Sequence, residues 1–320
     1  MILHIGLPRT GTTTLQKFLF SDESLFAPSR TLDQKISKFH RMAGVGIPLP
    51  DSVADIKGAI NTLSEIKRSA KGKIILVSDE KITSLGNTLA VQDLYARRLT
   101  RIDSKARIII TLRQQQGLMK SRFSQMRIRK HWAALGLFDT SRQYLKARMN
   151  KQARKLMRTL FVPDFVEWSK MGMENQESCW FSVMNYFDLF NCFARIFGHQ
   201  NVKVLFFEDL KQNSNHFAEQ LAKFIGINSE TILSAIDNTA NSSPTGIRIW
   251  DRVMKNFKYP GEGINLSYAL QYMLGLKTAN DKNLELLDLV RTHYGRQNRK
   301  LSQLLGEDLA ARGYLMDSEQ

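Results

Sequence analysis

The sequence predicts an α/β protein of three layers, in which helices cover both faces of a central, mostly parallel sheet. Short apolar runs within residues 2–5, 73–77, 106–112 and 201–210 are typical of buried strands. Stretches with apolar residues at helical spacing separate these runs and supply the long connections that parallel strands need. The hydrophobic fraction of 43% suffices for a sizeable core. We therefore expect a single domain over residues 1–320.

The first strand leads into a predicted phosphate-binding loop. A turn bounded by Gly6 and Gly11 follows the strand, and a helix is predicted from Thr12 to Phe20. The first amides of a helix have no partner within it, and they attract an anion. The turn adds a fixed positive charge and several hydroxyl donors. The residues predicted to bind the phosphate are Arg9, Thr10, Gly11, Thr12, Thr13 and Thr14.

This loop differs from the loop of nucleoside-triphosphate hydrolases. Gly6 and Gly11 have the spacing of the pattern Gly-x-x-x-x-Gly-Lys-Ser/Thr, but Thr12 stands at the lysine position. The basic residue of this loop is Arg9, which precedes that position. A kinase or nucleoside triphosphatase with a phosphate-binding loop therefore remains an alternative function, although this loop lacks the lysine that such enzymes have.

Two stretches resemble a known enzyme family. Residues 8–13, Pro-Arg-Thr-Gly-Thr-Thr, resemble the 5′-phosphosulfate loop of sulfotransferases that use 3′-phosphoadenosine 5′-phosphosulfate (PAPS). Arg113 and Ser121, at and after the end of the third strand, match the signature with which the family binds the 3′-phosphate. The resemblance implies a P-loop-like sulfotransferase fold with helical insertions, PAPS as co-substrate, and no metal. The residues that it implies for a later, nucleotide-covering loop are Asn241, Ser242 and Arg248.

The second strand ends in acidic residues that are candidates for a general base. In open parallel sheets ligands bind at the carboxyl ends of strands. Sulfuryl transfer to a hydroxyl or amine requires removal of the acceptor proton, and the residues alone leave Asp79 and Glu80 as candidates. Several sulfotransferases have a Glu-Lys pair here, so the resemblance implies Glu80 as the base and Lys81 as its electrostatic support. A histidine brought in by folding remains open.

The composition is strongly basic, with a net charge of +16 and a pI near 9.9. Such a balance favours an anionic partner. The basic residues are densest over 120–158, which predicts a groove for an acidic acceptor, a membrane-surface helix or a solvated helix face. Few aromatic residues accompany them, so no specific nucleic acid is expected. A non-enzymatic binder of anionic polymers or membrane surfaces is the second alternative function.

Cysteine usage and hydropathy predict a cytoplasmic protein. Cys179 and Cys192 lack the spacing of a metal site or a disulfide framework, which fits a reducing compartment. No apolar stretch reaches the ~20 residues of a membrane span. Because the first strand begins at residue 2, we expect no signal peptide before it.

The remaining segments carry local predictions. Asp51 or Ser52 is predicted to cap the helix over 51–70. Residues 163–180 are predicted to be irregular. Asp209 is predicted to cap a helix after the fourth strand. By resemblance, that strand and the following Glu-Asp-Leu are a sulfotransferase hallmark without a catalytic role. Residues 126–200 are expected to form a helical insertion that selects the acceptor. Apolar spacing predicts three helices, over 51–70, 89–101 and 181–197.

Together these features predict an enzyme. On the resemblance, it transfers a sulfuryl group from PAPS to a hydroxyl or amine of an unidentified acceptor, which is a carbohydrate, a lipid or a small metabolite. The transfer is expected to be an in-line displacement in which positioning and charge supply the catalysis. Arg9 would stabilise the departing oxygen and Glu80 would take the acceptor proton.

Overall fold

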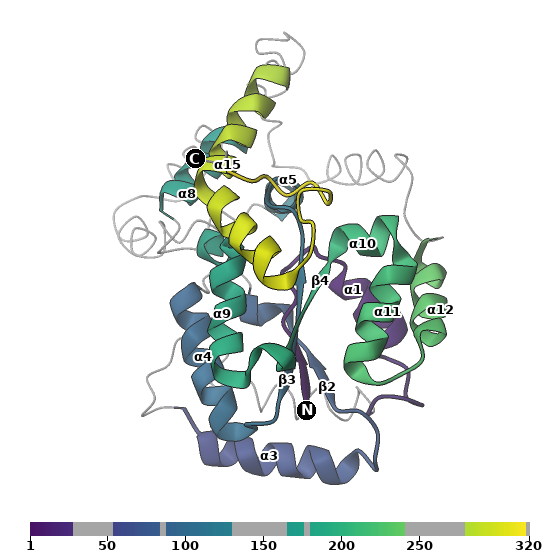
Figure 1. Ribbon diagram of the computed structural model, residues 1–320. Helices are drawn as coiled ribbons and strands as arrows, with labels where there is room; N and C mark the ends of the chain where they lie inside the picture. Colours follow the sequence, from purple (N-terminus) through teal and green to yellow (C-terminus); the bar gives the residue numbers. More distant parts are fainter. Residues whose placement is uncertain (28–53, 84–87, 130–164, 176–179, 241–278, 318–320) are drawn as a thin grey trace, which may run out of the picture.

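The computed structural model describes residues 1–27, 54–83, 88–129, 165–175, 180–240 and 279–317. Four strands form one parallel sheet in the order β2-β1-β3-β4 (Figure 1). In register, Ile2 of the central strand β1 lies opposite Leu76 of β2 and Arg107 of β3. Because the strands share one direction, their carboxyl ends meet at a single edge. The bounds of the strands are β1 (Ile2–His4), β2 (Leu76–Ser78), β3 (Arg107–Leu112) and β4 (Val202–Phe206).

Alternate strand residues point into two separate cores, as the pleat of a strand requires. Leu3, Ile108 and Ile110 belong to the core on one face of the sheet, whereas Ile2 and Ile109 belong to the core on the other. Since both faces are apolar, each must be covered by helices. The predicted three-layer α/β architecture is thereby confirmed.

Different helices cover the two faces (Figure 1). One core contains residues of α3 (Ile56–Ser69), α4 (Leu89–Ile102), α5 (Gln115–Arg129), α8 (Phe165–Glu174), α9 (Tyr186–Phe197) and α15 (Ala279–Leu305). The other contains residues of η1 (Leu15–Leu19), α11 (Ser214–Ile225) and α12 (Ser229–Ala240). The shorter helices are α1 (Thr12–Thr14), η2 (Glu80–Thr83), η5 (Trp180–Met184), η6 (His199–Asn201) and α10 (Phe207–Gln212). Among the residues that the structure describes, no helix combines the length and the apolar character needed to cross a membrane.

Three local predictions were wrong. Helix α3 begins at Ile56, later than predicted, because Asp55 caps it by accepting a hydrogen bond from the Gly58 amide at 2.8 Å. Part of the segment predicted to be irregular is helix α8, whose buried Trp168 packs on Phe181. Helix α10 follows β4 directly, without a side-chain cap, and Asp209 lies within its first turn. Local composition did not reveal these features, because each depends on a packing partner or on the choice between similar caps.

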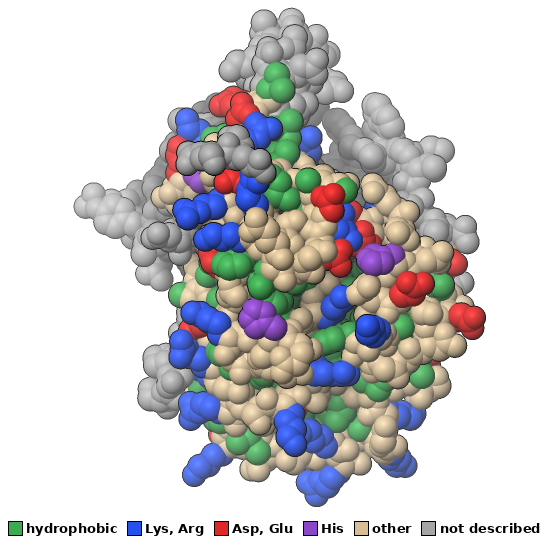
Figure 2. Space-filling model, in the orientation of Figure 1, with side chains coloured by type: hydrophobic (Ala, Val, Ile, Leu, Met, Phe, Trp, Pro, Cys, Tyr) green, Lys and Arg blue, Asp and Glu red, His purple; other side chains and the backbone are tan. Residues whose placement is uncertain are grey.

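The positive charge of the chain is widely distributed. Figure 2 shows basic side chains spread over the visible face, densely in its lower half, whereas acidic side chains gather in its upper part. Exposed Lys67, Arg68 and Lys71 lie at and just beyond the end of α3. The basic balance of the sequence is therefore not confined to residues 120–158.

The chain leaves β1 through a closely packed glycine. A Cβ atom added to Gly6 would lie 2.2 Å from Thr12 Cγ2 and 2.3 Å from Thr111 Oγ1. Both threonines are buried, so neither can move away into solvent. Only glycine therefore allows the start of the loop to approach α1 and β3 this closely.

We expect Gly6→Ala to destabilise the fold strongly. The added methyl group overpacks a buried site, which should lower the free energy of unfolding by about 3 kcal/mol. Gly72→Ala is a matched control, because a methyl group there meets nothing within 4 Å and only the positive φ of 82° opposes it. Its expected cost is about 1 kcal/mol. Urea unfolding of both variants checks this, and equal losses would show that Gly6 is not crowded.

Candidate active site

The loop between β1 and α1 is held from beneath by two buried hydroxyl groups. Thr10 donates to the carbonyl oxygen of Leu7 at 2.6 Å, and Thr83 of η2 donates to the carbonyl oxygen of Gly6 at 3.0 Å. These carbonyl groups are therefore bonded towards the protein interior. No side-chain hydrogen bond caps α1 at Gly11. The Thr14 amide donates to the Gly11 carbonyl oxygen at 3.0 Å, whereas the amides of Thr12 and Thr13 keep their capacity to bind an anion.

A buried histidine continues this network across the sheet. The single proton of the Thr10 hydroxyl is used on Leu7, so the 2.9 Å contact between Thr10 and Thr111 requires Thr111 to donate. Thr111 has then spent its own proton, and its 3.2 Å contact with His4 requires Nε2 of the imidazole to donate. Proton counting thus fixes the tautomer of His4.

The other imidazole nitrogen completes this hydrogen-bond network. A neutral imidazole that donates from Nε2 accepts at Nδ1. Ser78 at the end of β2 therefore donates to His4 Nδ1 at 2.7 Å, and its oxygen accepts from Gln16 Nε2 at 2.9 Å. The hydrogen-bond network runs from Gln16 in η1 to the carbonyl group of Leu7, and each hydroxyl group in it donates its proton once. His4 thereby links the loop to three adjacent strands.

Charge on this histidine is strongly disfavoured. Desolvation by burial lowers the pKa of His4 from 6.5 to about 3. The imidazole is therefore neutral in the folded protein near neutral pH, as its two hydrogen bonds require.

Two arginines from distant parts of the sequence meet above the loop. Arg9 has a positive φ of 76°, and its Nε donates to Ser121 Oγ of α5 at 2.8 Å. The two residues are 112 positions apart in sequence. Arg113, at the end of β3, donates from Nη1 to the carbonyl oxygen of Arg9 at 3.2 Å, and its guanidinium lies 4.6 Å from the centre of the Phe207 ring. The two stretches that resemble phosphate-binding motifs are thus in direct contact.

This cluster has an excess of positive charge. Among the described residues, neither Arg9 nor Arg113 forms an ion pair with a carboxylate. Burial lowers the pKa of Arg113, and the nearby charge of Arg9 lowers it further, although the charge of Glu208 opposes both. Two adjacent guanidinium groups, free amides and the more accessible hydroxyl groups of Thr13 and Thr14 form a donor set that fits an anionic phosphate ligand.

Glu80 lies in η2, just beyond the end of β2. Burial raises the pKa of this carboxyl group and the charge of Asp79 adds to the rise, while the charges of Arg122 and Arg9 lower it. The balance is a raised pKa. Among the described residues, the Glu80 carboxylate forms no hydrogen bond or ion pair, which leaves its oxygens available for a ligand. The Glu80 carboxyl group thus combines a raised pKa with the nearby positive charges of Arg122 and Arg9.

Comparison with known proteins identifies the family. Residues 1–245 match the family model of the sulfotransferase domain. The chain belongs to the sulfotransferase domain family. No curated protein matches its sequence. Among solved structures, a sulfotransferase from Alicyclobacillus acidocaldarius is similar over 98% of each chain, with 12% sequence identity and a TM-score of 0.47.

Within this sulfotransferase domain, the predicted loop residues have unequal access to a ligand. The hydroxyl group of Thr10 is used inside the loop, and Thr12 is buried against Gly6. Thr10 and Thr12 can therefore offer a ligand only their amides, whereas Thr13 is exposed and Thr14 is half-buried. Lys81 lies in η2 beside Glu80. Outside the described residues lie Asn241, Ser242, Arg248 and residues 130–158 of the basic region.

Sequence analysis missed the residues that support the site from within. His4 lies in an apolar strand without any motif, and Gln16 and Thr111 have no distinctive spacing. Arg122, which is buried and acts electrostatically on Glu80, could have been noticed because it directly follows Ser121. The supporting residues become visible only when the strands are side by side.

We expect His4 to make the fold sensitive to acid. Its stabilising effect is fully present above pH 6.5 and is lost as the pH falls from 6.5 to about 3, because only the unfolded chain binds a proton there. Between pH 7 and pH 5 the loss should be about 2 kcal/mol. His4→Gln removes this component, so the difference in unfolding free energy between wild type and variant should shrink by that amount.

Urea unfolding at both pH values measures this effect, with the exposed His199→Gln as a control for loss of an imidazole. A difference that stays constant between pH 7 and pH 5 would contradict a neutral, buried His4.

Proposed function

We propose that this protein transfers a sulfuryl group from PAPS to a hydroxyl or amine of an acceptor, with Glu80 as general base. The contact of Arg9 with both Ser121 and Arg113 carries the proposal. It joins a loop suited to a 5′-phosphosulfate to the arginine and serine suited to a 3′-phosphate. A nucleotide with phosphate groups at both positions would engage both sets of donors.

The residues present suggest a division of roles in the transfer. The acceptor oxygen or nitrogen would attack the sulfur atom, while the bond from sulfur to the phosphate oxygen breaks in line with it. Arg9 and the first amides of α1 would stabilise negative charge on the departing phosphate oxygen. Glu80 would take the acceptor proton, so that the products are the sulfated acceptor and 3′-phosphoadenosine 5′-phosphate (PAP).

The environment of Glu80 supports its role as the base. Its raised pKa makes the carboxylate a better proton acceptor than an ordinary surface glutamate, and its oxygens are not engaged elsewhere among the described residues. Lys81 follows directly in η2 and would support the negative charge that develops in the transition state. No metal is needed in this scheme, because guanidinium groups and amides supply the positive charge.

We further propose that the acceptor is anionic and that the protein acts in the cytoplasm. The net charge of +16 would attract an acidic carbohydrate, lipid or metabolite over a long range. The basic residues 120–158 are the proposed contact, either with the acceptor itself or with a membrane surface that carries it.

Binding of PAP should require its 3′-phosphate. In calorimetric titrations without magnesium, we expect wild type to bind PAP more tightly than ADP or ATP. Arg113→Ala should weaken PAP binding by about 1.5–3 kcal/mol, the scale of a hydrogen bond to a charged group. The control is Arg97→Ala, since the exposed Arg97 pairs with Asp93 on α4. Equal or tighter binding of ATP by wild type would favour a kinase-like function instead.

Glu80→Gln should abolish sulfuryl transfer but leave PAP binding nearly unchanged, because the amide keeps the shape and loses the basicity. Transfer of labelled sulfuryl from PAPS to a panel of sugars, lipids and amines measures the rate. The exposed Glu65→Gln on α3 is the matched control. In wild type, kcat/KM should fall with decreasing pH around a pKa above the ordinary 4.5 of glutamate. Unchanged turnover in Glu80→Gln would exclude Glu80 as the base.

A further inference from the structure

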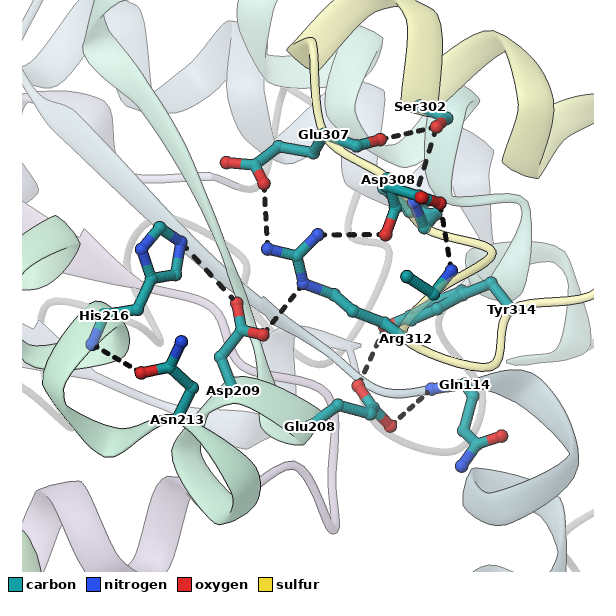
Figure 3. Close-up of polar contacts among 12 residues, drawn as sticks. Gln114, Glu208, Asp209, Asn213, His216, Ser302, Glu307, Asp308, Arg312 and Tyr314 are labelled. Carbon is teal, nitrogen blue, oxygen red and sulfur yellow. Dashed lines mark hydrogen bonds and ion pairs between the residues drawn. The ribbon is translucent and has the colours of Figure 1, made fainter.

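One peptide group near the proposed 3′-phosphate site is held from both sides. The carbonyl oxygen of Arg113 accepts a hydrogen bond from the Tyr186 hydroxyl at 2.6 Å. The amide of Gln114, which belongs to the same peptide group, donates to Glu208 Oε1 at 3.1 Å (Figure 3). Tyr186 and Glu208 are both buried. The orientation of this peptide group determines where the Arg113 side chain leaves the end of β3.

Glu208 is itself held by a residue far along the chain. The hydroxyl group of Tyr314 donates to Glu208 Oε2 at 3.3 Å (Figure 3). Both carboxylate oxygens therefore accept a hydrogen bond, a pattern that fits the ionised form, because a protonated carboxyl group would need an acceptor of its own. Its negative charge faces the positive charge of Arg113. Glu208 thus supports the arginine electrostatically without forming an ion pair that would compete with a phosphate.

The ring of Tyr314 is firmly placed. It packs edge-on against Tyr186 and Phe206, with ring centres 6.1 and 5.8 Å apart. Two residues earlier, Arg312 forms ion pairs with Asp209 and Glu307 at 2.8 Å each (Figure 3). Its guanidinium group also lies over the ring of Phe206. The packing of the Tyr314 ring therefore holds its hydroxyl group at Glu208.

Residues 306–317, which we term the clasp, connect the ends of two strands. On the β3 side, the Gly313 carbonyl accepts from Gln116 Nε2 at 3.0 Å. On the β4 side, Arg312 and Tyr314 bind Asp209 and Glu208. These two strand ends present Arg113 and Phe207, the residues that stack at the proposed 3′-phosphate site. The clasp lies beyond residues 1–245, which match the family model.

We propose that Tyr314 and Glu208 are positioning residues that orient Arg113 and so determine the preference for a 3′-phosphorylated nucleotide. The proposal rests on the proposed function, in which Arg113 binds that phosphate. Tyr314 acts through Glu208 on the peptide group between Arg113 and Gln114. Loss of its hydroxyl leaves Glu208 with one donor fewer and lets that peptide group turn.

The decisive measurement is the ratio of PAP affinity to ADP affinity in full-length variants. Tyr314→Phe keeps the ring and removes one hydrogen bond, so PAP affinity should fall about three- to tenfold. ADP affinity should not change, because ADP has no group at Arg113. Glu208→Gln, which removes the charge and cannot accept from Tyr314 and Gln114 equally well, should lower the same ratio.

Tyr294→Phe is the matched control, because Tyr294 is also buried and donates to a carbonyl group, that of Phe181, at 3.2 Å. It should lower thermal stability and leave the PAP:ADP ratio as in wild type. In an Arg113→Ala background, Tyr314→Phe should have no further effect on the ratio. This last comparison separates a role through Arg113 from a general structural role.

The outcomes are distinguishable. If wild type prefers PAP but Tyr314→Phe keeps the wild-type ratio, or weakens PAP and ADP equally, the positioning role is wrong and the proposed function stands. If wild type binds PAP and ADP equally, the assignment of Arg113 to a 3′-phosphate is wrong, and the positioning role falls with it. Should Tyr314→Phe fail to fold, Glu208→Gln gives the same comparison.

Discussion

The geometry of the site depends on one buried imidazole. His4 ends the central strand and is hydrogen-bonded to Ser78 of β2 and to Thr111 of β3. A neutral imidazole has one donor and one acceptor, so it can join the hydroxyl groups on its two sides in only one direction. That direction ends at the Leu7 carbonyl, which accepts the Thr10 proton within the loop. A protonated imidazole would present two donors and reverse the hydrogen bond to Ser78. Burial and hydrogen bonding therefore both select the neutral imidazole.

Two glutamates that follow the outer strands β2 and β4 illustrate how hydrogen-bond partners decide the use of a carboxylate. Burial raises the pKa of both Glu80 and Glu208. Glu208 receives hydrogen bonds on both oxygens and is thereby fixed, which suits a structural support. Glu80 receives none among the described residues, and only charges act on it at a distance, which suits proton transfer. Residue type and the direction of the pKa shift would not separate the two, since the difference lies in the hydrogen-bond donors that the rest of the fold brings to each.

Much of the site could be predicted because it consists of short segments at the ends of strands. The loop residues and Arg113 lie within a few positions of a strand end, and Ser121 follows eight residues after Arg113, so the resemblance to sulfotransferase motifs could point to them. The strand order and the contact between Arg9 and Ser121 could not be predicted, because they depend on how separate segments pack. Tyr314 is further still from any local signal, since the glutamate that it contacts is 106 positions away. The missed start of α3 has a different cause, as Asp and Ser caps are nearly equivalent by residue type.

The positive charge at the proposed phosphate site comes from segments that are distant in sequence. A nucleoside-triphosphate hydrolase has its lysine within the loop itself, whereas here Arg113, which contacts Arg9 of the loop, lies just beyond the end of β3. Arg9 adopts a left-handed conformation, which costs about 1 kcal/mol or more for a residue other than glycine. It is held there because its carbonyl group accepts from Arg113 and its side chain donates to Ser121. The anion site is therefore complete only when the loop, β3 and α5 are packed together, and the clasp extends the same dependence to residues 306–317. In the proposed function, a ligand with phosphate groups at two positions would contact the loop, the end of β3 and α5 together.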